Sequence, residues 1–399
     1  MPRSNHLEKK TNSSPPVLPN ANGLFQVPRL DEMILTTLRM ERLNELIACN
    51  NTSPLWTQYK LTPDLQDRLR NIYMPVVAKY LGQLIGRDGK QNEAEALIKV
   101  NPALLLARVE IETHSKGLKP NDKPVVLEGT AFQLAARVTE DDKMAAMIAK
   151  YLDEYYPYVD ADHPGEKLKQ DQDWLAANAA NETKREQQDI AALDKMFNAI
   201  QNADDKVCER VLNEEETIIA DDKEAEPLLK ALNDFRNYLI PKEVVTGKQF
   251  NIQLLIQAFQ FYDKNYETFG GFNSPKNNLC WRKVIGFMQR FLPAHYAQAF
   301  AQGTYYIVVN GEEVCRRFDF RYGDGSYFPL DSDPNFRMGY NCGMAGGSGF
   351  VGGRRVGLFD GFKDCWTMRL ESLCQAKTVA LQGIMQQPCN QSQSKRLVM

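Results

Sequence analysis

The chain has 399 residues, of which 43% are hydrophobic and 25% are charged, and its formal net charge is −3. One hydrophobic core seldom serves more than roughly 250 to 300 residues, so two or three packed units are expected. The small net charge excludes the broad basic excess of a nucleic-acid-binding protein. No run approaches the roughly 18 apolar residues that cross a bilayer, so no membrane span is expected.

The cysteines and the N-terminal residues indicate the compartment. Eight cysteines are present, without a C-x-x-C pair and without the regular spacing of a disulfide framework. The first ten residues lack the apolar core of a secretory signal. We therefore expect reduced thiols and a cytoplasmic protein.

The first part of the chain carries the apolar spacing of helices. Residues 1–24 are polar and rich in Asn, Ser and Pro, and we expect them to form a disordered tail. Apolar side chains recur at helical spacing over residues 31–48 and 61–85, where Pro75 interrupts the second run. Residues 92–106 predict two short helices, because the residue before Pro102 disfavours the helical conformation.

A hairpin and a helix pair are predicted next. Residues 107–113 alternate apolar and polar side chains, and residues 124–127 form a second short apolar run. The segment 129–136 reads Gly-Thr-Ala-Phe-Gln-Leu-Ala-Ala, in which Thr130 is placed to cap a helix and the two last alanines allow a partner helix to approach. Apolar positions between Met144 and Leu152 predict the second helix of the pair.

This helix pair is similar to an ankyrin repeat, which opens with G-x-T-P-L-H-x-A-A. Ala131 and Gln133 replace the proline and the histidine of that motif, and the usual glycine between the helices is missing. Residues 94–105 resemble a remnant of a preceding repeat. A stable array needs roughly three repeats, so this unit has to pack on other helices. An ordinary helical hairpin is the alternative interpretation.

The segment 160–230 has a different composition. Aromatic residues are scarce, and Glu, Asp, Lys, Gln, Asn and Ala dominate. This composition favours helix but leaves only a thin apolar stripe, which includes Leu193 and Phe197. We predict solvated connecting helices or a small helical hairpin.

After Pro241 the chain becomes rich in aromatic residues and glycine, and a separate domain is expected to begin there. Helices are predicted over residues 250–266, 277–302 and 370–385. Two β-prone runs, 304–309 and 314–320, are joined by Asn310-Gly311. This dipeptide predicts a hairpin, because a type I′ turn needs positive φ at both central positions.

Together these patterns predict a mainly α fold with small β hairpins, in which a helical N-terminal unit with the ankyrin-like pair precedes an α+β C-terminal domain. The predicted units are a disordered tail at 1–24, a helical ankyrin-like domain at 25–158, a polar helical connector at 159–240, an aromatic- and Gly-rich α+β domain at 241–385 and a flexible tail at 386–399.

Two short motifs in the last third suggest ligand binding. Asp331 and Asp333 resemble the D-x-D of metal-dependent glycosyltransferases, in which paired carboxylates hold a divalent ion on the phosphates of a nucleotide sugar. No nucleotide-binding series of strands and helices precedes them, and a turn capped by Asp333 before Pro334 is the alternative. Residues 347–352 satisfy G-x-G-x-x-G, but without a preceding apolar strand they predict a glycine-rich loop.

Two Cys-Trp pairs, which begin at Cys280 and Cys365, resemble the pair in papain-like thiol proteases. A thiol nucleophile needs a base, and His295 lies 15 residues after Cys280. Along one helix this separation is roughly 22 Å at 1.5 Å per residue. Buried structural cysteines are therefore the preferred interpretation, and no catalytic residue is assigned. His114 and His163 are predicted to be isolated surface residues.

The ankyrin-like unit, together with Trp281-Arg-Lys-Val-Ile-Gly-Phe-Met-Gln-Arg-Phe-Leu-Pro and Phe328-Pro-Leu-Asp, resembles uncharacterised type IV secretion effectors of intracellular bacteria. The resemblance implies that residues 386–399 serve as an export signal. It also implies that the protein passes from the bacterial cytoplasm to the host cytoplasm and that its partners are host proteins.

We therefore predict a protein–protein interaction module that has no cofactor. Its predicted binding surface is the finger, which is the hairpin that precedes the helix pair, together with the first helix, around residues 116–134. Lys116, Lys119, Phe132 and Gln133 are predicted to make its contacts. The alternative function is a divalent-metal-dependent, glycosyltransferase-like transferase that uses Asp331 and Asp333.

Overall fold

The computed structural model describes residues 40–49, 52–55, 63–116, 123–160, 163–213, 222–271, 274–302, 304–316, 321–322, 325–326, 350–351, 354–355 and 365–386. The fold is mainly α with small antiparallel hairpins, which confirms the predicted class. Among these residues, no helix is long and apolar enough to span a membrane.

The N-terminal helices pack against one another. They are α2 (Met40–Ala48), α4 (Pro63–Gly82), the π-helical turn η2 (Gln83–Arg87), α5 (Gln91–Val100) and the 3₁₀ turn η3 (Pro102–Leu106). The predicted interruption at Pro75 is wrong, because α4 continues through it. A proline inside a helix costs about 3 kcal/mol. Tyr73, Val77 and Leu81 are each at most 1% exposed. Because burial of one aliphatic side chain stabilises a fold by about 1.5 to 3 kcal/mol, the burial of these residues offsets the cost of the proline.

The predicted helix pair forms as expected. It consists of α6 (Ala131–Gln133), the π-helical turn η4 (Leu134–Val138) and α7 (Asp142–Tyr155). Thr130 caps α6 in a reciprocal capping box with Gln133, as its position predicts. Ala135 and Ala136 are buried, and the apolar positions between Met144 and Leu152 face the core.

Another helix pair with the same turn occurs earlier in the chain, and it is built by α4, η2 and α5. In one turn Asp88 N donates to Gln83 O and Lys90 N donates to Leu84 O; in the other, Thr139 N donates to Leu134 O and Asp141 N donates to Ala135 O. The left-handed residue is Gly89 (φ 62°) in the first turn and Glu140 (φ 56°) in the second. Glu140 thus adopts the left-handed backbone conformation that Gly89 adopts in the other turn.

A β hairpin lies between the two helix pairs. It pairs β1 (Arg108–Lys116) with β2 (Pro124–Thr130) in antiparallel register, which confirms the prediction. Ile111 on β1 is fully buried against the end of α4 and η2. Gly82 and Gly86 permit this close approach, because a Cβ atom on Gly82 would lie 2.7 Å from Val109 Cγ2.

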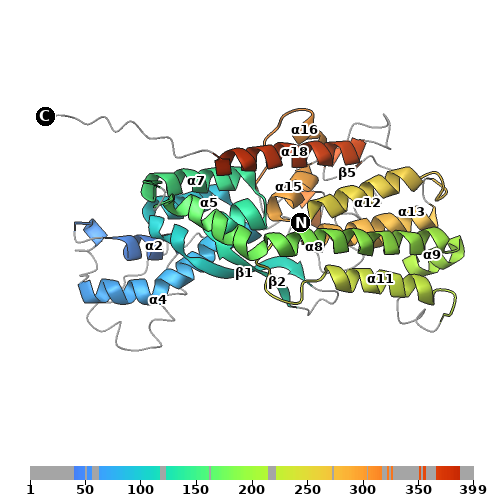
Figure 1. Cartoon of the computed structure of the whole chain (residues 1–399), viewed down its shortest axis with the longest axis horizontal. Helices are drawn as coiled ribbons and strands as arrows, with labels where there is room; N and C mark the ends of the chain where they lie inside the picture. Colours follow the sequence, from blue (N-terminus) through green and yellow to red (C-terminus); the bar gives the residue numbers. More distant parts are fainter. Residues whose placement is uncertain are drawn as a thin grey trace, which may run out of the picture.

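Helix α8 (Gly165–Asn202) runs along the long axis of the molecule, from the region of α7 to that of α9 (Figure 1). Its first half packs against α6 and α7, and its second half packs against the helices that follow it. Trp174, Leu193 and Phe197 are buried along this stripe. The polar composition suggested a solvated connector, but a thin apolar stripe is enough here because neighbouring helices cover it along its length.

The remaining helices are α9 (Asp205–Asn213), α11 (Glu226–Leu239), α12 (Ile252–Asn265), α13 (Pro275–Leu279), η5 (Cys280–Ile285), α14 (Gly286–Met288), η6 (Gln289–Phe291), α15 (Ala294–Gln302), α16 (Thr304–Val308) and α18 (Cys365–Gln386). One connected hydrophobic core includes side chains from Leu43 to Leu381. In Figure 1, α18 lies across the top of the molecule and α11 lies beside α8.

The predicted strand at 304–309 is wrong, because residues 304–308 form α16. Tyr and β-branched residues favour strand locally, but here the segment packs between α15 and α18, and tertiary contacts override the local preference. Short antiparallel pairs occur further along, between β3 (Arg321–Tyr322) and β4 (Gly325–Ser326) and between β5 (Phe350–Val351) and β6 (Arg354–Arg355).

Candidate functional site

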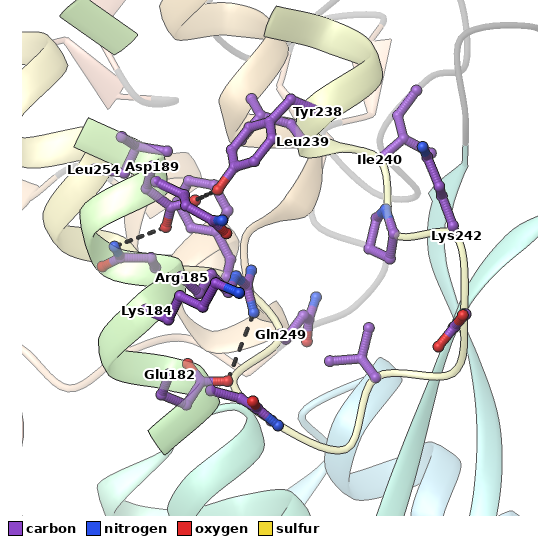
Figure 2. A pocket seen from close by; sticks show the side chains of 18 of the residues that line it. Glu182, Lys184, Arg185, Asp189, Tyr238, Leu239, Ile240, Lys242, Gln249 and Leu254 are labelled. Carbon is purple, nitrogen blue, oxygen red and sulfur yellow. Dashed lines mark hydrogen bonds and ion pairs between the residues drawn. The ribbon is translucent and has the colours of Figure 1, made fainter. Parts of the chain in front are cut away.

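A pocket of about 900 Å³ lies between α8, the end of α11 and the segment that leads into α12. We call residues 240–251 of that segment the strap. The pocket is lined from the helices by Glu182, Lys184, Arg185, Asp189 and Tyr238, and from the strap by Val244 among others. Figure 2 shows the strap on one side of the pocket and α8 on the other.

The strap is attached to the hairpin on its outer side. Val245 forms a parallel bridge with Leu127, in which Val245 N donates to Val126 O (2.8 Å) and Glu128 N donates to Val245 O (2.9 Å). The run Val244-Val245-Thr246 favours extended backbone. The strap is therefore held to β2 through this isolated bridge.

The strap is also attached to α8. Trp174 Nε1 donates to Thr246 O (2.9 Å), and Arg185 Nη1 donates to Lys248 O (2.6 Å). In return, Lys248 N donates to Glu182 Oε1 (3.1 Å). A Cβ atom on Gly247 would collide with this carboxylate oxygen, so glycine permits the close contact. These bonds give the pocket a wall that is rigid before any ligand arrives.

A buried carboxylate forms the inner end of the pocket. Asp189 is 2% exposed and accepts hydrogen bonds from Tyr238 Oη (2.7 Å) and from Asn251 Nδ2 (2.9 Å). Burial, followed by the hydrogen bond to Asp189, raises the pKa of Tyr238, so this phenol stays protonated and donates. Asn251 in turn caps α12 by accepting from Gln253 N. Asp189 therefore holds α8, α11 and α12 together.

Two cationic side chains reach from α8 towards the strap (Figure 2). Lys184 is exposed, and it forms no ion pair with the residues that the structure describes. The side chain of Arg185 is 33% exposed; it is fixed by Lys248 O and lies 3.9 Å from Glu182. Burial raises the pKa of Glu182, although Arg185 opposes the shift. The open part of the pocket thus presents cations beside apolar side chains.

A second polar cluster joins the two helix-pair turns, and we call Asp141, His295 and Arg316 the turn clamp. Arg316 Nη1 and Nη2 donate to both oxygens of Asp141 (2.6 and 2.7 Å), and Arg316 Nη1 also donates to Gly89 O (3.2 Å). Burial alone would raise the pKa of the Asp141 carboxyl, but the bonds and charge of Arg316 hold it well below its usual range. One guanidinium therefore binds both turns.

His295 is the buried neutral member of the turn clamp. It is 1% exposed, its Nδ1 lies 3.9 Å from Asp141 Oδ2, and its Nε2 has no hydrogen-bond partner in the described part of the chain. Burial and the charges of Lys377 and Arg316 lower its pKa well below 6.5, although Asp141 opposes them. The folded protein therefore disfavours the imidazolium form.

This burial predicts a loss of stability in mild acid. The unfolded histidine binds a proton near pH 6.5, before the folded one does, so the free energy of unfolding should fall below that pH. The slope should approach about 1.4 kcal/mol per pH unit. Urea unfolding between about pH 7 and pH 5 measures it. His295→Asn should flatten the slope and exposed His163→Asn should not; equal slopes in wild type and His295→Asn would contradict the prediction.

The predicted protein-binding residues are only partly described, and two of them require correction. Phe132 is fully buried and Gln133 is 3% exposed, so neither side chain can contact a partner. Gln133 instead completes the capping box and donates from Nε2 to Gln170 O (2.8 Å) on α8. The backbone of Lys116 belongs to β1, and Lys119 lies outside the described residues.

The predicted metal and thiol residues are also only partly described by the structure. Asp331 and Asp333 lie outside the described residues, as does most of the G-x-G-x-x-G segment. Cys280 is fully buried, as expected, and burial raises the pKa of its thiol well above 9.0. Cys365 begins α18, and its side chain is not among those described. His163 is exposed, as expected.

The pocket residues escaped the sequence predictions. Lys184, Arg185 and Asp189 lie in the polar segment that suggested a connector, Tyr238 lies near the end of the predicted connector, and Val244 lies just beyond it. The β-prone run after Pro241 is the one local signal of the strap.

Comparisons with known proteins give no relative from which a function could be transferred. No family model, curated protein or solved structure matches this chain. In the part of the chain that the structure describes, no group of three or more His, Cys, Asp or Glu side chains is arranged to hold a metal ion. The strap pocket is the best-defined candidate site in that part.

Proposed function

We propose that the protein is an interaction protein that binds a segment of another protein in the strap pocket. The observation that carries the proposal is the exposure of large apolar side chains beside a preformed hollow. Tyr238 is 38% exposed and Val244 is 39% exposed, and both line the pocket. Apolar surface that borders a concave site is typical of contact surfaces.

The construction of the pocket supports a peptide segment as the ligand. Its volume of about 900 Å³ is at the upper end of the range for ligand pockets, roughly 300 to 1,000 Å³. One wall is the strap and the other is a helix face, so a bound chain can contact side chains on both walls. Because bonds to α8 and β2 fix the strap, binding costs little ordering of this wall.

The resemblance to type IV secretion effectors remains a prediction from the sequence. It would make the bound segment part of a host protein. The transferase alternative gains no support from the described residues, because Asp331 and Asp333 lie outside them.

Filling the pocket should abolish peptide binding. Peptides selected on the full chain from a random display library, then labelled with fluorescein, should bind the wild type and fail to bind Val244→Trp. The larger side chain occupies part of the pocket that Val244 lines. Fluorescence anisotropy measures the binding, and we expect affinity to fall by about two orders of magnitude, or about 2.7 kcal/mol.

The matched control is Val379→Trp, which introduces the same side chain at an exposed position (58%) of α18, outside the pocket lining. Its affinity should equal that of the wild type, and both variants should unfold at the wild-type temperature. Selected peptides that bind Val244→Trp as tightly as wild type would contradict a binding site in this pocket.

A further inference from the structure

The charged groups around the strap pocket differ in how far they are already engaged. The lining includes four carboxylates, from Glu182, Asp189, Asp234 and Glu243, and three cations, from Lys184, Arg185 and Lys242. By formal count the two signs nearly cancel. The contacts of each group decide which of them remains available to a ligand.

Three of the four carboxylates have donors within the protein. Glu182 accepts from Lys248 N, and Asp189 accepts from Tyr238 and Asn251. Asp234 accepts from Lys195 Nζ (2.9 Å). Lys195 offsets the charge of Asp234, and the neutral donors to Glu182 and Asp189 occupy acceptor sites that a ligand could otherwise use. Among the lining acids, Glu243 on the strap is the exposed one without such a bond to a described residue.

The two cations on α8 are engaged to different extents. Lys184 has no ion pair with a described residue, and its side chain extends towards the strap in Figure 2. Arg185 uses one nitrogen, Nη1, to hold Lys248 O and to pair with Glu182 Oε1 (3.9 Å), and its side chain remains one third exposed. Its guanidinium carries five N–H donors, and the bond to the strap fixes the plane from which the others project. A fixed guanidinium beside a free ammonium suits a carboxylate.

We infer that the strap pocket selects a peptide segment with an acidic side chain next to apolar ones, and that Lys184 and Arg185 bind its carboxylate. This inference rests on the proposed function, because it names the chemistry of the bound segment. Apolar side chains of that segment contact Tyr238 and Val244. Glu243 limits the affinity, because it brings a negative charge to the opposite wall.

The test uses the full chain and the labelled display-selected peptides that Val244→Trp fails to bind. Lys184→Glu should weaken their binding about tenfold, because the change replaces an attraction with a repulsion at a partly exposed site. Glu243→Gln should tighten binding about threefold, because it removes a repulsion. Lys230→Glu is the matched control for charge, since Lys230 is exposed on α11 outside the pocket lining, and it should leave the affinity unchanged.

The peptide supplies the complementary half of the experiment. Replacing its Asp and Glu residues with Asn and Gln should weaken binding to wild type about tenfold and should add little to the effect of Lys184→Glu. Raising the salt from about 0.05 M to about 0.2 M should weaken the acidic peptide more than the amide version.

The outcomes separate the two proposals. Peptides that need the open pocket but carry no acidic residue, or that bind Lys184→Glu as tightly as wild type, would overturn the acidic preference and leave the proposed function standing. Peptides that bind Val244→Trp and wild type equally would overturn both proposals.

Discussion

The Arg316→Met variant should lose about 3 to 5 kcal/mol of unfolding free energy, because it leaves the Asp141 carboxylate buried without its main counter-ion. Asp141 is 1% exposed and both of its oxygens accept from Arg316. Methionine keeps most of the length of the side chain but offers no donor. The variant also loses the bond to Gly89 O, which joins the first helix-pair turn to the second.

Two comparisons make this result specific to the turn clamp. Adding Asp141→Ser to Arg316→Met should recover most of the loss, because serine still caps α7 and carries no charge. Lys195→Met removes a surface pair with Asp234 whose side chains are 65% and 47% exposed, and it should cost at most about 1 kcal/mol. Urea unfolding at pH 7 measures all three. Similar losses in Arg316→Met and Lys195→Met would refute the turn clamp.

The Phe197→Ala variant should lose about 3 to 5 kcal/mol, the usual cost of removing a buried aromatic ring. Phe197 is 1% exposed, and its ring stacks on Phe261 of α12 with centroids 3.8 Å apart. The substitution leaves a cavity at the contact between α8 and the C-terminal helices. We expect thermal unfolding to begin at a clearly lower temperature than in wild type.

An exposed residue of the same helix provides the control. Ile190 belongs to α8 but is 40% exposed, so Ile190→Ala should cost less than about 1 kcal/mol. If α8 were a solvated connector, the two substitutions would cost the same. Equal losses in Phe197→Ala and Ile190→Ala would therefore contradict the packing of α8.

Elements that depend on local chemistry could be predicted from the sequence. The cap at Thr130 and the β1–β2 hairpin are specified by residues close together in the chain, and both form as expected. The run 304–308 shows the limit of such reasoning. Its strand preference is real, but contacts with α15 and α18 decide its conformation, and those partners cannot be read from the run itself.

The likeness of the two helix-pair turns and the position of the pocket could not be predicted from the sequence, for different reasons. Glu140 adopts the left-handed conformation that a pattern search expects of glycine, so the likeness to the turn at Gly89 shows only in the backbone. The pocket depends on segments that meet in space, since Arg185 and Lys248 are far apart in the chain. Lysine and arginine on a polar helix are typical of any solvated face. The face of α8 that lines the pocket differs from other solvated faces because the strap lies opposite it.

Hydrogen–deuterium exchange of the full chain, with and without a saturating display-selected peptide, tests the central claim most directly. The pocket predicts that bound peptide slows exchange in residues 240–247 of the strap and in residues 181–189 of α8, and leaves the hairpin at 108–130 unchanged. Slower exchange at the hairpin, with an unchanged rate at the strap, would contradict the strap pocket and favour the finger surface at residues 116–134.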